Sequence, residues 1–69
     1  MTQDQLVNNF SYHPPTSEQV PVYEEIRSRF RQLAEYLNDV LPESREKSVA
    51  FTELEAANFW SNAAIARNK

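Results

Sequence analysis

Apolar residues recur at helical spacing in the middle of the chain and predict a long helix there. They are Val22, Ile26, Phe30, Leu33, Leu37, Val40 and Leu41. Steps of three and four residues place these side chains on one helical face, opposite a charged face. Ser17 is the predicted N-cap, and Pro21 fits the first turn, where no amide proton is needed. We expect the helix to end at Leu41, because Pro42 disfavours helical backbone in the residue before it.

A second long helix is expected from Glu43 or Ser44 to about Ala66. One broad stripe holds Val49, Ala50, Leu54, Ala57, Trp60 and Ala64, whereas Phe51, Phe59, Ile65 and Ala66 point elsewhere. A helix that is apolar around most of its circumference is buried on more than one side. The first long helix can cover one side. The apolar residues on the other side therefore predict contacts with further copies of the chain.

The N-terminal segment is shorter and is interrupted by prolines. Residues 2–9 are expected to form one or two helical turns, with Thr2 as N-cap and Asp4 in the first turn. Pro14 and Pro15 keep the "YHPP" stretch extended. The expected fold is a single all-α domain over residues 1–69. It has a short N-terminal helix or arm and a long antiparallel helical hairpin.

Composition adds an expectation about assembly and location. The 69 residues include no cysteine, so no disulfide can stabilise the fold. A two-helix chain of this size buries little apolar surface by itself, which predicts a compact homo-oligomer. No apolar run approaches the ~20 residues of a membrane span, and the start lacks the pattern of a signal peptide. We therefore expect a soluble, cytosolic protein without a membrane partner.

Charge and side-chain chemistry favour binding over catalysis. The net charge is −3, but the positive residues are clustered, which suits a small anionic ligand better than a long phosphate backbone. Solvated helix faces with salt partners are the simpler alternative. The chain has no glycine for a phosphate-binding loop and one histidine. No enzyme activity, metal site or cofactor is expected.

Tyr12 and Arg27 are the first candidates for contacting such a ligand. A tyrosine ring can stack on a purine, and an arginine can hold a phosphate through two hydrogen bonds. The alternative is that Tyr12 and Phe10 only pack against the fold and that Arg27 pairs with Glu24. Composition by itself favours this alternative.

Three stretches of the sequence resemble a family of small phage proteins. They are "NNFSYHPP", "YEEIR" and "PESREKSVAFTELEAANFWSNAAIARNK", and the similarity runs from about Asn9 to Asn68. The family is that of the phage anti-CBASS cyclic-nucleotide sponges, the second anti-CBASS type described. The resemblance implies binding of cyclic di- and trinucleotides such as 3′,3′-cGAMP, without catalysis, in the cytoplasm of the infected bacterial host. It also implies a compact homohexamer whose ligand pockets are shared between chains.

The resemblance also implies a cyclic dinucleotide site. Its residues are Tyr12, His13, Pro14, Pro15 and Arg27. Tyr12 falls on the tyrosine of the family's "YHPP" element, which contacts the dinucleotide, and the two prolines would shape the pocket wall. Arg27 lies near a basic family position that often holds lysine, and Arg29 or Arg31 could share its role.

The resemblance further implies a separate trinucleotide site, formed by other basic and amide residues. Its candidates are Arg67 and Asn68 of the "IARN" element, together with Arg45 and Lys47 of the "SREK" element. The alternative for "SREK" is a structural one, namely helix capping with side-chain pairs three and four residues apart.

Two further hypotheses come from other functional classes. In the first, the chain is a protein-interaction adaptor whose apolar second long helix docks on a host protein. In the second, it is a small DNA-binding regulator. The acidic balance and the lack of a clearly basic recognition helix count against DNA binding.

Overall fold

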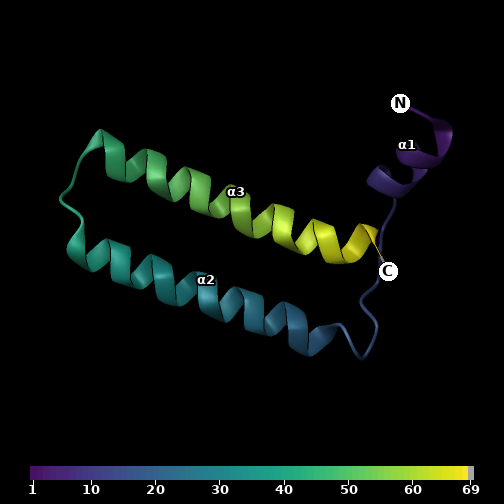
Figure 1. Cartoon of the computed structure of the whole chain (residues 1–69), viewed down its shortest axis with the longest axis horizontal. Helices are drawn as coiled ribbons and strands as arrows, with labels where there is room; N and C mark the ends of the chain where they lie inside the picture. The colour runs from purple at the N-terminus through teal and green to yellow at the C-terminus, as the bar shows by residue number, and fades with distance from the viewer. Residues whose placement is uncertain (69) are drawn as a thin grey trace.

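The computed structural model describes residues 1–68, and these residues form three helices and no strand. The helices are α1 (Gln3–Phe10), α2 (Val20–Val40) and α3 (Arg45–Arg67). Helices α2 and α3 lie side by side and antiparallel, and α1 stands at the open end of this hairpin (Figure 1). The predicted all-α hairpin with a short N-terminal helix is confirmed.

Thr2 is the N-cap of helix α1, as predicted, and it forms a capping box with Gln5. The Thr2 hydroxyl accepts the backbone N–H of Gln5 at 3.1 Å, and the Gln5 side chain accepts the backbone N–H of Thr2 at 2.8 Å. This reciprocal pair satisfies two amide protons at the start of the helix. The helix ends at Phe10, and residues 11–15, here called the arm, have no regular secondary structure.

The predicted N-cap Ser17 is wrong, because Gln19 is the residue that precedes α2, and a reciprocal pair of the capping-box type lies one turn earlier, between Thr16 and Gln19. The Thr16 hydroxyl accepts the backbone N–H of Gln19 at 3.2 Å, and the Gln19 side chain accepts the backbone N–H of Thr16 at 3.0 Å. The residue three positions after Ser17 is Val20, which cannot return such a bond. Regular α2 starts at Val20, after a turn over residues 17–19, with Pro21 in its first turn as predicted.

The turn between the long helices follows the sequence prediction closely. Helix α2 ends at Val40, with Leu41 as an extended C-cap before Pro42. Ser44 is the N-cap of α3, and its hydroxyl accepts the backbone N–H of Lys47 at 3.1 Å. Helix α3 extends to Arg67, one residue beyond the predicted end.

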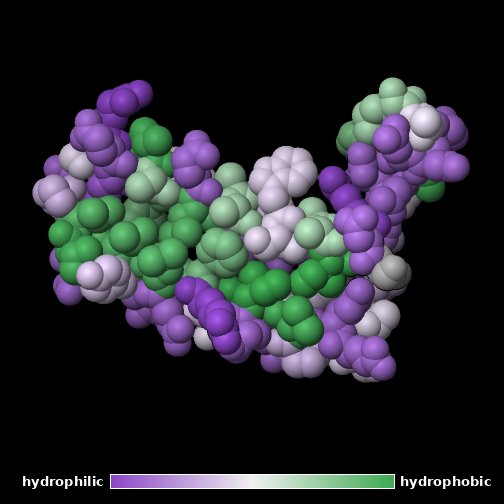
Figure 2. Space-filling model, viewed as in Figure 1, coloured by the Kyte–Doolittle hydropathy of each residue, from purple (hydrophilic) through white to green (hydrophobic). Residues whose placement is uncertain are grey.

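The described chain is one helix layer thick. Its dimensions are 45 × 30 × 13 Å, and the shortest one is close to the ~10–12 Å diameter of a single helix. No hydrophobic residue in this layer is fully buried. Figure 2 shows the resulting apolar surface along the hairpin. No helix in residues 1–68 is long and apolar enough to cross a membrane.

The half-buried face of α3 differs from the predicted stripe. Phe51 and Ile65, which were expected to point elsewhere, are half-buried, while Val49 and Trp60 are exposed at 44% and 66%. Periodicity alone could not choose a face, because apolar residues surround this helix.

Candidate functional site

A hollow of about 340 Å³ lies at the open end of the hairpin. It is lined by His13, Pro15, Val20, Tyr23, Arg27 and Asn62. These residues come from the arm, from α2 and from α3, so the hollow exists only where the three segments meet. Of the predicted dinucleotide residues, the structure brings His13, Pro15 and Arg27 together here.

Arg27 differs from the neighbouring arginines of α2 in having no ion-pair partner among residues 1–68. Arg29 pairs with Glu25 at 2.9 Å, and Arg31 pairs with Glu35 at 3.1 Å. Arg27 is exposed and lines the hollow, so its guanidinium is free to bind an anion. Both pairs join residues four positions apart on one helix, so their spacing is visible in the sequence and agrees with the choice of Arg27 as the first candidate.

Tyr12 and Pro14 lie outside the lining of the hollow. Tyr12 is 84% exposed, and Pro14 is exposed as well. Tyr12 directly precedes His13 in the arm, and its ring is largely uncovered by this chain. It is therefore available to a ligand or to another copy.

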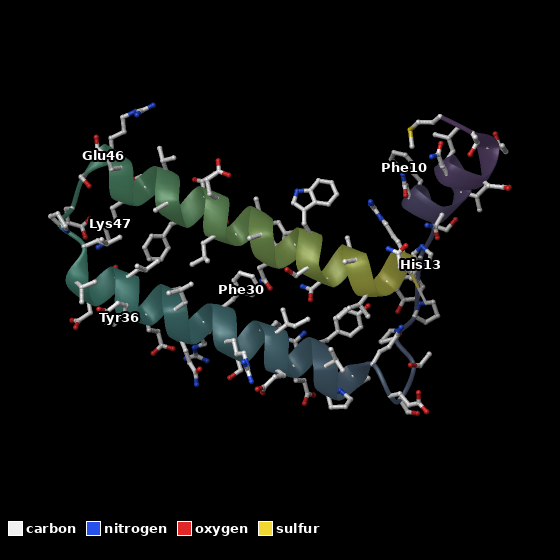
Figure 3. The ribbon with its side chains drawn as sticks, in the orientation of Figure 1. Phe10, His13, Phe30, Tyr36, Glu46 and Lys47 are labelled. Atoms are coloured by element: carbon white, nitrogen blue, oxygen red, sulfur yellow. The ribbon has the colours of Figure 1, made fainter. Side chains whose placement is uncertain are left out.

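His13 is partly committed to the fold. Its Nε2 atom lies 2.6 Å from the backbone carbonyl oxygen of Asn8. A carbonyl oxygen only accepts, so His13 donates through Nε2 and keeps only Nδ1 for other partners. Figure 3 shows His13 close to the C-terminal end of α3.

Three lining residues were missed at the sequence level, namely Val20, Tyr23 and Asn62. Tyr23 lies one helical turn before Arg27 on α2, a spacing that places both on one face. Asn62 lies on α3, and its buried Oδ1 atom has no hydrogen-bond partner among the described residues. Its signal in the sequence was an amide within an otherwise apolar stretch.

The predicted trinucleotide residues do not come together within one chain. Arg45 lies at the start of α3, whereas Arg67 is its last residue. At 1.5 Å per residue, a helix of 23 residues separates its ends by about 33 Å. A site containing both arginines therefore requires more than one copy.

Arg67 and Asn68 make contacts within the chain. The Arg67 Nη2 atom donates to the backbone oxygen of Asn9 at 3.5 Å, and its guanidinium carbon lies 5.8 Å from the centroid of the Trp60 ring. Asn68 Nδ2 donates to the backbone oxygen of Ala64 at 3.0 Å. Arg67 is half-buried, and Asn68 is exposed.

Lys47 is the only buried residue of the described chain, with 8% of its surface exposed. Its Nζ atom donates to the backbone oxygen of Asn38 at 3.2 Å and forms an ion pair with Glu43. Figure 3 shows the side chain at the turn end of the hairpin. These contacts fit the structural alternative for "SREK", since partners within the chain satisfy the ammonium group. Arg45 is exposed.

A larger groove of about 680 Å³ lies between α2 and α3. Phe30, Phe51 and Leu54 are among its apolar lining residues, and Arg27 and Arg31 are among its charged ones. Arg27 lines both this groove and the hollow at the open end. An anion held by Arg27 would therefore lie next to an uncovered apolar surface.

A comparison with models of known protein families found one that matches this chain. The model described as "Acb2/Tad1, hairpin domain" matches residues 2–66, a range that includes every residue lining the hollow. No curated protein and no solved structure matches the chain. The match covers well over half of the sequence and confirms the resemblance seen in its motifs. The chain therefore belongs to the Acb2/Tad1 hairpin family, that of the anti-CBASS cyclic-nucleotide sponges.

Proposed function

We propose that this protein binds and sequesters cyclic di- and trinucleotides, such as 3′,3′-cGAMP, without degrading them. It acts in the cytoplasm of the infected bacterial host and keeps CBASS effectors inactive. The observation that carries the proposal is the unpaired guanidinium of Arg27 beside a hollow lined by Tyr23 and His13. Membership of a sponge family supports the same function.

Each residue of the proposed dinucleotide site has its own role. Arg27 binds a phosphate of the cyclic backbone, and the exposed Tyr12 ring stacks on a base. Pro14 and Pro15 restrict the backbone of the arm, so little conformational entropy is lost when a ligand binds. No group in this set serves as a paired nucleophile and base, so the ligand leaves unchanged.

The site is completed by other copies of the chain. Its volume of about 340 Å³ is at the low end of the ~300–1,000 Å³ typical of ligand pockets. The exposed Phe59 and Trp60 provide apolar surface that an assembly would cover. In a homohexamer, Arg67 and Asn68 of some copies would form the trinucleotide site, with Arg45 contributed by others.

Isothermal titration with 3′,3′-cGAMP tests the dinucleotide site. We expect tight binding by the wild-type protein and a large loss in Tyr12→Ala, because the variant loses the stacking surface. Denaturing the complex should release intact ligand. Recovery of a linear nucleotide would contradict sequestration, and no binding of either 3′,3′-cGAMP or cyclic tri-adenylate would remove the proposed function.

The adaptor hypothesis has one observation in its favour, namely the exposed Phe59 and Trp60 on α3. Sedimentation velocity, which measures the oligomeric state, together with the titration distinguishes the sponge from the adaptor. A hexamer that binds cyclic nucleotides supports the sponge, whereas a monomer that ignores them supports an adaptor surface on α3.

A further inference from the structure

Helix α1 needs an anchor to keep a fixed place. It has eight residues, none of them buried, and isolated helices shorter than ~12 residues are marginal in water. Figure 1 shows that it stands apart from the body of the hairpin, near the C-terminal end of α3. Its position must therefore depend on a small number of contacts.

Asn8 provides the shortest hydrogen bond between α1 and α3. Its Nδ2 atom donates to the backbone oxygen of Arg67 at 3.2 Å. The Arg67 side chain reaches back to the backbone oxygen of Asn9 at 3.5 Å. Carbonyl groups in the last turn of a helix have no partner within that helix. Each of these two helix ends therefore supplies a donor for a free carbonyl of the other.

Asn8 also holds the arm. Its backbone oxygen accepts the hydrogen bond from His13 Nε2 at 2.6 Å, so the arm folds back onto the last turn of α1. Beyond His13 the chain continues into the hollow through Pro15. Asn8 thus connects the end of α3, the end of α1 and the residue that follows Tyr12.

We infer that Asn8 is a positioning residue for the nucleotide site. It does not line the hollow, and it acts by fixing α1 to α3 so that the arm presents Tyr12 and His13 beside Arg27. This inference rests on the proposed function for its ligand, but its structural part can be measured without any ligand.

Asn8→Ala and Asn9→Ala form a matched pair for the test. Asn8→Ala removes the side-chain bond to Arg67, whereas Asn9 uses only its backbone oxygen, which the alanine variant keeps. We expect faster amide hydrogen exchange in α1 and the arm of Asn8→Ala, with α2 and α3 unchanged. Its affinity for 3′,3′-cGAMP should fall about fivefold to tenfold, the effect of one hydrogen bond. Asn9→Ala should resemble the wild-type protein in both measurements.

Asn8→Asp distinguishes the hydrogen bond from packing. The carboxylate has the same shape but no N–H donor for the Arg67 carbonyl, although it can pair with the Arg67 guanidinium, so Asn8→Leu, which has a similar size and no charge, is made beside it. Asn8→Leu should lose affinity as Asn8→Ala does, and wild-type exchange in Asn8→Ala or wild-type affinity in Asn8→Leu would overturn the positioning role. If the wild-type protein does not bind 3′,3′-cGAMP, the proposed function falls, and the exchange comparison alone decides whether Asn8 anchors the arm.

Discussion

The two ends of the helical hairpin use their polar groups in opposite ways. At the turn end, a hollow of about 220 Å³ is lined by Asn38, Glu43 and Lys47, and these groups bind one another. At the open end, Arg27 has no ion-pair partner among the described residues, and the Oδ1 atom of Asn62 has no hydrogen bond. The polar groups at the turn end therefore have partners within the chain, whereas Arg27 and Asn62 at the open end keep polar atoms without one among the described residues.

The comparison shows that positive charge alone does not identify a binding residue. Lys47 and Arg27 both lie in basic clusters of the sequence. Lys47 is buried against a carbonyl oxygen and a carboxylate, so an anion would have to displace existing partners. An anion that binds Arg27 has no ion-pair partner to displace in the described part of the chain, and the Arg27 side chain is exposed. A charged side chain that already has partners within the chain stabilises the fold, whereas one without such partners is available to a ligand.

Arg27→Ala should have the largest effect on ligand binding. We expect the affinity for 3′,3′-cGAMP to fall about 100-fold, since charge-assisted contacts to phosphate are stronger than neutral hydrogen bonds. The control is Arg29→Ala, because Arg29 is paired with Glu25 on the surface. Titration calorimetry on both variants is the measurement. Equal losses in both, or no loss in Arg27→Ala, would contradict the assignment of Arg27.

Lys47→Met should mainly reduce stability. The variant keeps the apolar stem but leaves the carbonyl of Asn38 without its donor, at a cost of about 2 kcal/mol. Thermal unfolding at matched protein concentration should show a fall in Tm of roughly 10 °C, with the affinity for 3′,3′-cGAMP unchanged. Arg45→Met is the exposed control. An unchanged Tm with lost binding of cyclic tri-adenylate would instead make Lys47 a ligand residue.

Thr16→Ala should have the smallest effect, and this effect should be on stability. Loss of the Thr16 hydroxyl, which accepts the backbone N–H of Gln19 in the turn before α2, costs about 1 kcal/mol of unfolding free energy, whereas Ser17→Ala should cost nothing measurable. Urea unfolding of the two variants gives the comparison. The opposite order of stabilities would contradict the role of Thr16 in the turn before α2.

Much of the fold could be predicted because its signals are local. The capping box at Thr2, the break at Pro42 and the cap at Ser44 each depend on residues within a few positions of one another. The error at Ser17 was also local, since a competing threonine with a better-spaced glutamine lies next to it. The candidate site was predicted less completely, because Tyr23 and Asn62 have no motif of their own.

The sequence by itself determined three helices, their approximate ends, the extended arm and the family motifs. Only the tertiary structure decided which face of α3 is half-buried and that the Lys47 ammonium group reaches the backbone oxygen of Asn38 on α2. It also revealed Asn8, whose partner Arg67 is 59 positions away in the sequence. Helix formation follows from neighbours within about one turn, whereas a binding site depends on side chains that meet only after the chain has folded.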